Sequence, residues 1–280
     1  MPEGDTIFRT ATSLRNWLNG RIITGVTARD PRLGIERLVG LALVDVTTHG
    51  KHLFMEFHSP AGPGDREAND RLVLRTHMMM TGSWHVYSSG DRWHRPARQV
   101  VASLTAGDRL AVCFNAPVVE LLNRRRSAAQ HYLGGYGPDI LADPLDVDEI
   151  VKRSGAILPS TAIGVTLLDQ HVVAGIGNIY RCESLFQQHI SPFAAVRILS
   201  EPDFRKLIQC AAALMRANLS SSTAGRFSGA SDRPWVYGRA GRPCRVCRSF
   251  VQRAKLGHQA RAVYWCATCQ PGPIPPGGVL

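Results

Sequence analysis

The first twenty residues show the periodicity of an amphipathic helix. Apolar side chains recur every three or four positions, at Ile7, Ala11, Leu14 and Leu18. This spacing lines one face of a helix, which Asp5 or Thr6 can cap and Gly20 can end. The sequence therefore predicts a helix over roughly residues 6–19.

A strand-rich region follows this helix. Short runs of apolar, β-branched and aromatic residues are separated by turn residues, at positions 53–57, 71–75, 84–87, 100–104 and 110–114. Short strands of this kind predict a sandwich or a barrel. The stretch 59–70 is rich in proline, glycine and charge, which indicates a long surface loop.

The pattern changes near Pro138. From about residue 146 to 220 the chain has helical character, and residues 201–219 form the clearest amphipathic segment. Residues 224–261 then carry nine Lys or Arg side chains and one acid, Asp232. The last ten residues, 271–280, are rich in proline and glycine and predict a disordered tail. The expected divisions are a β domain at 1–138, a helical domain at 139–225, a cysteine-containing domain at 226–270 and the tail.

Charge narrows the range of partners. The chain of 280 residues has 33 Lys and Arg against 22 Asp and Glu, a net charge of +11. Such an excess favours a polyanionic partner, because each neutralised phosphate releases condensed counterions. The sequence has no apolar run of membrane-spanning length and no signal-peptide pattern. We expect a soluble intracellular protein, and the odd count of seven cysteines argues against a fully paired secreted framework.

Four cysteines form a metal-binding pattern. Cys244 and Cys247 are one C-x2-C pair, and Cys266 and Cys269 are a second pair after 18 intervening residues. Two such pairs can hold one tetrahedral zinc ion with four thiolates, which leaves no position for a water molecule. The sequence predicts one structural zinc, against the alternative of four structural or redox cysteines. The remaining cysteines are interpreted as ordinary buried thiols, at Cys113, Cys182 and Cys210.

A glycine-rich segment precedes one of the expected helices. In the run Gly175-Ile176-Gly177-Asn178 the glycines allow unusual backbone angles, and Asn178 suits the N-cap of a helix beginning near Ile179. Backbone amides would converge there on an anion such as phosphate. A plain loop and N-cap is the alternative interpretation.

Taken together and in order, these motifs resemble one family. They are Met1-Pro2-Glu3-Gly4, Gly50-Lys51-His52-Leu53, the segment 175–180 and the four-cysteine hairpin. The chain is similar from residue 2 to residue 269 to the formamidopyrimidine-DNA glycosylase/endonuclease VIII family. The resemblance implies an α+β multidomain fold, with an N-terminal β-sandwich and flanking helix, a helix-two-turn-helix domain and a C-terminal zinc-finger β-hairpin. It also implies that damaged DNA is held between the domains.

The resemblance implies a bifunctional enzyme of base excision repair. Pro2, exposed after removal of Met1, would be the nucleophile, and a free α-amino group has a pKa of about 7.7–8.0. Its attack on the sugar C1′ would displace the base and lead to an iminium ion that acidifies the C2′ proton, so that β,δ-elimination nicks the strand. Glu3 would protonate the sugar ring oxygen and shuttle protons.

Other positions match the DNA-contacting residues of the family. Lys51 would bind the phosphate beside the lesion and assist catalysis, and Asn178 would bind phosphate. Arg261 would reach across the minor groove from the zinc finger and is counted with both the catalytic and the DNA-binding residues. Met79 and Met80 would fill the space left by the extruded base, since three consecutive methionines cannot all face one core.

One departure from the family bears on the substrate. The formamidopyrimidine branch carries an Arg-Phe type wedge on a second loop, where this chain has Phe114-Asn115-Ala116-Pro117. This difference favours the endonuclease VIII branch and oxidised pyrimidines as substrates. The segment that would cap the lesion, about 220–231, is rich in serine and glycine and indicates no specificity.

The expected partners follow from the same reasoning. Damaged DNA and one structural zinc ion are expected, with no membrane and no small-molecule cofactor, in a monomer of the bacterial cytoplasm associated with the nucleoid. Two other functions remain open: a catalytically inactive DNA-binding protein on the same scaffold, and an RNA-binding structural protein. Pro2, Glu3 and Lys51 argue against both, because neither function requires them.

Overall fold

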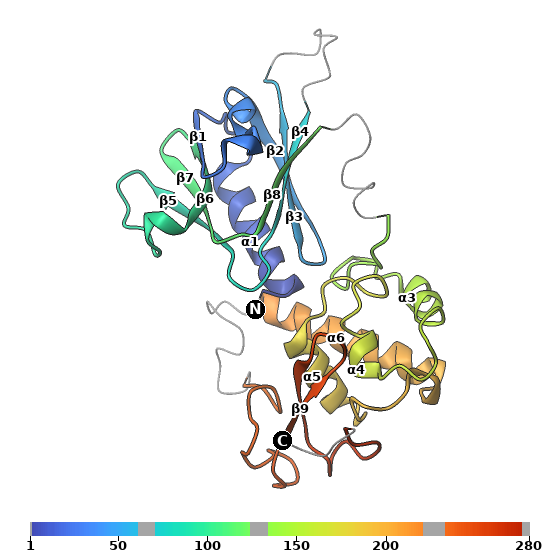
Figure 1. Ribbon diagram of the computed structural model, residues 1–280. Coiled ribbons are helices and arrows are strands. Elements are labelled where there is room, and N and C mark those ends of the chain that lie inside the picture. Colours follow the sequence, from blue (N-terminus) through green and yellow to red (C-terminus); the bar gives the residue numbers. More distant parts are fainter. Residues whose placement is uncertain (1, 61–70, 124–133, 221–232, 276–280) are drawn as a thin grey trace. The chain divides into compact units, whose positions relative to one another are not determined.

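The chain folds into two compact units, Met1–Gly135 and Tyr136–Leu280 (Figure 1). The computed structural model describes residues 2–60, 71–123, 134–220 and 233–275. Most of the predicted loop at 59–70 and nearly all of the segment 220–231 lie outside the described residues. The first unit is a β-sandwich with one long helix, and the second combines helices with a β-hairpin, so the predicted α+β fold class is confirmed.

Two antiparallel four-stranded sheets build the first unit. One has the strand order β1-β6-β7-β5, with bounds Gly25–Ala28, Val100–Ala106, Arg109–Phe114 and Ser83–Ser88. The other has the order β2-β3-β4-β8, with bounds Ala42–His49, His52–His58, Leu72–His77 and Val118–Asn123. Short 3-10 helices connect the strands at Pro31–Leu33, Ile35–Leu38 and Ala97–Gln99.

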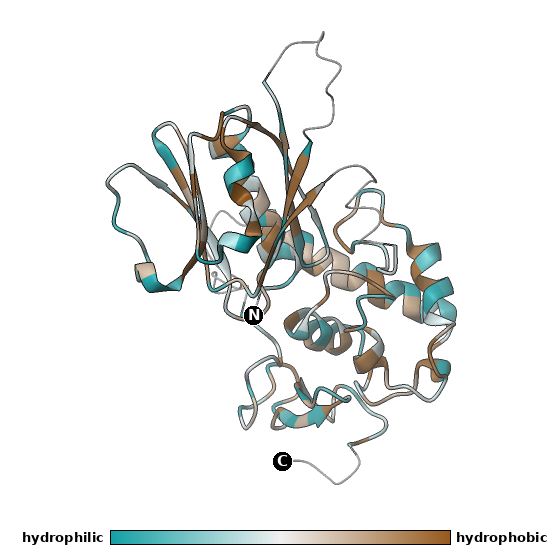
Figure 2. Ribbon diagram, turned by 45° about the horizontal axis from the view of Figure 1, so that its top comes forward, coloured by the Kyte–Doolittle hydropathy of each residue, from teal (hydrophilic) through white to brown (hydrophobic). Residues whose placement is uncertain are grey.

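Helix α1 (Gly4–Leu18) packs against strands of both sheets. Its predicted apolar face is buried with the inward-facing residues of the strands, in one core that includes Ile7, Leu14, Leu18, Leu53, Leu74 and Leu104. Hydrophobic residues run along the strands of this unit (Figure 2). Each such side chain contributes roughly 1.5–3 kcal/mol when fully buried, so this core anchors both the helix and the chain that leads into it.

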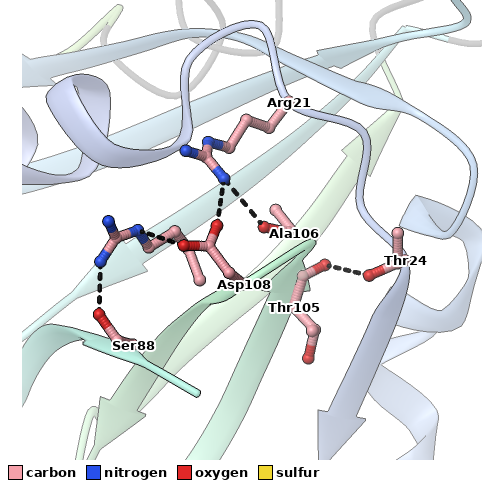
Figure 3. A network of polar contacts seen from close by, with 7 residues as sticks. Arg21, Thr24, Ser88, Thr105, Ala106 and Asp108 are labelled. Carbon is pink, nitrogen blue, oxygen red and sulfur yellow. Dashed lines mark hydrogen bonds and ion pairs between the residues drawn. The ribbon is translucent and has the colours of Figure 1, made fainter.

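A polar network fixes the chain after α1 to the β6–β7 turn (Figure 3). Arg21 Nη1 donates to Asp108 Oδ1 at 2.7 Å and to the Ala106 carbonyl at 3.5 Å. Arg109 Nη1 donates to Ser88 Oγ at 2.5 Å, and its Nε lies 3.3 Å from Asp108 Oδ2. Asp108 therefore joins one arginine before β1 to another at the start of β7.

The sequence pattern did not indicate three of the strands of the first unit. β1 has only four residues, and β2 carries Asp45, Thr47 and Thr48 among its apolar positions. β8 is an edge strand in which Glu120 pairs with Arg75 of β4. These strands are stabilised by their neighbours in the sheets, so their own alternation is weak.

The second unit begins with a helical region. Its α-helices are α3 (Val147–Ser154), α4 (Ile163–Thr166), α5 (Asn178–Gln187) and α6 (Glu201–Ser220), with a 3-10 helix at Val196–Ile198. α5 packs against α6 around a core that includes Tyr180, Leu185, Leu207 and Met215. The predicted amphipathic helix at 201–219 is confirmed.

A β-hairpin completes the second unit. β9 (Gln252–Leu256) and β10 (Arg261–Trp265) pair antiparallel, and β10 contacts α5. The hairpin has its own apolar cluster, in which Trp265 packs edge-to-face on Phe193 with ring centroids 4.8 Å apart. This hairpin and the helices belong to one compact unit. The finer domain boundaries expected from the sequence, 139–225 and 226–270, stay predictions.

The helices and the C-terminal end of the described chain have two further features. Among the described residues, no helix has both the length and the apolar character that crossing a membrane requires. At the C-terminal end, Ser191 Oγ donates to the Pro273 carbonyl at 2.8 Å, which ties residue 273 to the helical region. The last five residues of the expected tail lie outside the described part.

Candidate active site

The start of α1 holds two buried acids next to Pro2. The backbone oxygen of Glu3 accepts hydrogen bonds from the amides of Thr6 at 3.0 Å and Ile7 at 3.1 Å, so Glu3 is the N-cap residue. Glu3 and Asp5 are fully buried, and Pro2 before them is half-buried. The helix start therefore fixes the backbone beside Pro2 and keeps the Glu3 carboxyl out of bulk water.

Lys51 lies in the tight turn between β2 and β3, directly before the first residue of β3. Gly50, the other residue of the turn, has a φ of 57°, a left-handed angle that favours glycine. The two strands pair up to His49 and His52, so the turn projects Lys51 from the end of the hairpin. Lys51 is half-buried.

Two histidines lie beside Lys51. His52 and His77 face each other across β3 and β4, with ring centroids 4.6 Å apart. Burial lowers the pKa of His52 to about 3, assisted by the neighbouring His77, Arg75, His49 and Lys51. Burial likewise lowers the pKa of His77 to about 4, and the positive charges of Lys51 and Arg75 act in the same direction. Both imidazoles are therefore neutral at neutral pH, and the positive charges beside them include those of Lys51 and Arg75.

This pair predicts a pH dependence of stability. In the unfolded chain the imidazoles titrate near 6.5, so below that pH the unfolded state binds more protons than the folded state. The free energy of unfolding should therefore be fully retained above about pH 6.5 and fall as the pH drops toward 4. His77→Asn should remove one of these groups and lose less stability between pH 7 and pH 5, by on the order of 1 kcal/mol. Urea unfolding of both proteins at the two pH values checks this, and equal losses would contradict it.

The loop between β4 and β5 presents the predicted pair of methionines. Met78 is buried in the core, whereas Met79 is 50% exposed and Met80 is 69% exposed. The amide of Gly82 donates to the Met78 carbonyl at 2.8 Å, and a Cβ at Gly82 would lie 2.7 Å from that oxygen, so the turn requires glycine. The loop therefore buries its first methionine as an anchor and turns the next two toward solvent.

A second loop, between β7 and β8, adjoins this methionine loop. Asn115 has a φ of 49° and its carbonyl accepts from Thr81 Oγ1 at 3.3 Å. Phe114 is fully buried and Ala116 is 5% exposed. Residues 114–117 thus present no large exposed side chain, in keeping with the departure noted in the sequence.

In the second unit the structure brings Asn178 and the hairpin together. Asn178 Nδ2 donates to the Ala262 carbonyl at 2.8 Å, next to Arg261 on β10. Arg181, fully buried, donates to the same carbonyl at 2.8 Å and to the Asn178 side chain. The predicted N-cap role of Asn178 is wrong: Gly177 is the cap residue and Asn178 begins α5. The side-chain oxygen of Asn178, which a cap would use as acceptor, accepts from Arg181 instead.

The glycine-rich loop before α5 is held from the side by Gln170. Its Oε1 accepts from the Gly175 amide at 3.0 Å, and its Nε2 donates to the Ile176 carbonyl at 3.1 Å. Gly175 has a φ of 106°, which only glycine adopts without strain. The loop therefore leads into the N-terminus of a ten-residue helix in a fixed conformation.

Glu183 connects α5 to the chain that enters the hairpin. Its carboxylate accepts from the amides of Trp235, Val236 and Tyr237 at 2.7, 3.1 and 2.8 Å. Burial raises the pKa of Glu183, while these three hydrogen bonds act in the opposite direction. The sequence did not indicate this role, since the partners lie more than fifty residues away.

The four cysteines of the two C-x2-C pairs, Cys244, Cys247, Cys266 and Cys269, meet at one point. Their Sγ atoms all lie within 4.8 Å of one another, with Cys244 and Cys269 at 3.9 Å and Cys247 and Cys266 at 3.4 Å. Four sulfurs bound tetrahedrally to one zinc at about 2.3 Å would be about 3.8 Å apart. The predicted cluster is confirmed, and its geometry fits one closed zinc site.

A Pro-Glu start on a β-sandwich, a glycine-rich loop before a buried helix and a four-cysteine hairpin together define a fold of DNA-repair glycosylases. Two family models match: the formamidopyrimidine-DNA glycosylase N-terminal domain over residues 1–117 and the formamidopyrimidine-DNA glycosylase H2TH domain over residues 136–228. The chain belongs to the formamidopyrimidine-DNA glycosylase and endonuclease 8 family.

Relatives and solved structures agree with this assignment. The chain is 36% identical to a probable endonuclease 8 2 of Streptomyces coelicolor, over 99% of this chain and 97% of that one. It is 32% identical to the DNA-(apurinic or apyrimidinic site) lyase Nei2 of Mycolicibacterium smegmatis, covering 96% and 99%. The fold matches a Lactococcus lactis formamidopyrimidine-DNA glycosylase bound non-covalently to DNA with an AP site, at a TM-score of 0.80, 21% identity and coverage of 96% and 100%.

These comparisons confirm the family resemblance inferred from the sequence, including the preference for its endonuclease 8 branch. They also confirm, at the level of the family, the expected enzyme class of DNA glycosylase and lyase.

Proposed function

We propose that this protein is a bifunctional DNA glycosylase and AP lyase that removes oxidised pyrimidines and then nicks the strand. The observation that carries the proposal is the start of α1, where half-buried Pro2 is followed by fully buried Glu3. It stands in a chain that is similar over nearly its whole length to endonuclease 8 proteins.

Pro2 supplies the reaction with its nucleophile. The neutral amine attacks C1′ of the damaged nucleotide and displaces the base. The bond between C1′ and the sugar ring oxygen then breaks as that oxygen is protonated, which gives a cationic iminium that acidifies the C2′ proton. Loss of that proton expels the 3′ phosphate, and a second elimination expels the 5′ phosphate. A blocked amine forms no iminium, so base removal and both eliminations depend on one group.

Glu3 is the proton donor in this proposal. Its side chain is buried beside Pro2, where a carboxyl is removed from bulk water and can protonate the sugar ring oxygen as C1′ is attacked. The N-cap bonds of Glu3 use its backbone oxygen and not its carboxyl. The same group then carries protons through the later steps.

Lys51, Asn178 and Arg261 grip the phosphates around the extruded nucleotide. Lys51 stands at the tip of a hairpin beside two neutral histidines, where its cationic side chain would contact a phosphate. Asn178 and Arg261 are neighbours through Ala262, at the N-terminus of α5, where the helix dipole favours an anion. Met79 and Met80, exposed on their loop, fill the space in the base stack.

Oxidised pyrimidines are the proposed substrates. The loop at residues 114–117 presents no large exposed side chain, unlike the Arg-Phe type wedge of the formamidopyrimidine branch. The relatives named endonuclease 8 point to the same branch.

An incision assay tests the proposed function. The protein is incubated with duplexes that carry an oxidised pyrimidine, 8-oxoguanine or a preformed abasic site, with borohydride present in parallel samples. We expect strand cleavage and a covalent adduct, with faster excision of the pyrimidine. Binding without cleavage or adduct would instead establish a DNA-binding protein on this scaffold, and a preference for RNA would contradict both.

The phosphate contacts predict a change in salt dependence. Replacing Lys51 or Arg261 by Ala should reduce the slope of log affinity against log salt by about one unit for each lost phosphate contact. Lys152, which pairs with Glu149 on α3, is the control of equal charge, and Lys152→Ala should leave the slope unchanged. Titrations at several salt concentrations measure this, and an unaltered slope in Lys51→Ala would remove the lysine from the interface.

The zinc site predicts a joint loss of metal and affinity. Elemental analysis should find about one zinc per chain, because one closed tetrahedral site needs four thiolates. Cys266→Ser should lower zinc content and DNA affinity together, whereas Cys210→Ser, outside the cluster, should change neither. Full zinc occupancy in Cys266→Ser would contradict ligation by all four cysteines.

A further inference from the structure

His77 stands where two functional features of the first unit meet. It is the last residue of β4, directly opposite His52, and it is close enough to Lys51 for that charge to affect it. The next residues along the chain are the buried Met78 and the exposed Met79 and Met80. One half-buried imidazole therefore links the hairpin that carries Lys51 to the loop that carries the methionines.

A hydrogen bond from His77 acts on Met79 itself. The Met79 amide donates to His77 Nδ1 at 3.1 Å. Met79 has a φ of 46°, in the left-handed region where a side chain with a Cβ is disfavoured. The other hydrogen bonds of this loop are made by Met78, Thr81 and Gly82. Among the described contacts, the bond to His77 is therefore the one that the Met79 backbone makes.

The bond requires one particular form of the imidazole. Nδ1 accepts a hydrogen bond only when it carries no proton, so a neutral His77 holds its proton on Nε2. Burial and the charges of Lys51 and Arg75 keep the pKa of His77 at about 4, and His52 is the other titratable ring against it. The accepting form is thus the one present at neutral pH.

We propose that His77 is a positioning residue that holds the Met79 backbone through Nδ1, so that Met79 and Met80 are turned outward to occupy the space of an extruded nucleotide. This inference rests on the proposed function, since it concerns the same base-extrusion step. It assigns the histidine a role through the backbone of the loop and not through contact with the reacting atoms.

Two variants of His77 separate this role from others. Asparagine carries an acceptor near the position of Nδ1, whereas the amide of glutamine reaches the position of Nε2. His77→Gln should slow extrusion of a fluorescent base analogue at the lesion about 3- to 10-fold, the effect of losing one neutral hydrogen bond. His77→Asn should stay near the parental rate. Cleavage of DNA with a preformed abasic site, where no base is extruded, should be similar in both variants.

The Met79→Ala/Met80→Ala double variant makes the outcomes distinguishable, and thermal unfolding shows whether each variant is folded. Slow extrusion in the double variant and in His77→Gln, with rescue in His77→Asn, supports the inference. If the double variant is slow but the two His77 variants behave alike, or glutamine is the better replacement, the inference is overturned and the proposed function stands. If the double variant extrudes at the parental rate, the wedge and the inference both fail, while abasic-site cleavage still reports on the proposed chemistry.

Discussion

A form of the protein whose N-terminus remains blocked by a fused tag is expected to lose base excision and covalent trapping altogether. The loss should be on the order of 10³-fold or more, the scale seen when an enzyme's covalent nucleophile is removed. The physical reason is that an amide nitrogen in place of the Pro2 amine cannot form an iminium. Gel-based excision and borohydride trapping measure the two effects.

A matched control keeps the amine and removes only the ring. In Pro2→Gly the processed chain still begins with a free α-amino group, so trapping should persist, although the primary amine changes its rate. DNA affinity should be the same in the blocked, glycine and parental forms. Normal turnover by the blocked form would show that Pro2 is not the nucleophile.

Replacing Glu3 by glutamine is the second change with a large expected effect. The substitution keeps the shape of a fully buried side chain and the N-cap bonds, which use the backbone, but it removes the titratable acid. Base excision should fall by on the order of 10²–10⁴, the usual contribution of a positioned general acid. Cleavage at a preformed abasic site should suffer less, because no base has to be expelled.

Asp5 provides the comparison within the same helix turn. It is as buried as Glu3 and also has a carboxyl group, so Asp5→Asn controls for the effect of removing a buried carboxyl near Pro2. We expect a much smaller loss of excision in Asp5→Asn. Unaltered excision kinetics in Glu3→Gln would exclude Glu3 from the mechanism.

Local patterns in the sequence predicted much of the fold. α1, the amphipathic helix α6 and five of the strands follow from spacing along the chain, because each buries one face against a core. The cysteine cluster could be predicted for a similar reason: each C-x2-C pair is itself a local turn. β2 and β8 could not, since their polar residues are stabilised by partners in neighbouring strands.

The features of the candidate site that the sequence could not predict depend on contacts between residues far apart in the chain. Asn178 was predicted to cap its helix, yet its side chain is used by the Ala262 carbonyl, 84 residues away. The sequence alone did not pair His52 with His77, because only the register of β3 and β4 brings them together. Pro2 and Glu3 have no local signature at all, so their roles follow from the family resemblance and not from spacing.

The central claim is that the N-terminal proline forms the covalent bond to DNA. The most direct test is to trap the full-length protein on abasic DNA with borohydride, digest the adduct and determine by mass spectrometry which peptide carries the sugar. We predict the modification on the N-terminal peptide, at the nitrogen of Pro2, with Met1 absent. A sugar attached to Lys51, or to any other lysine, would contradict this account.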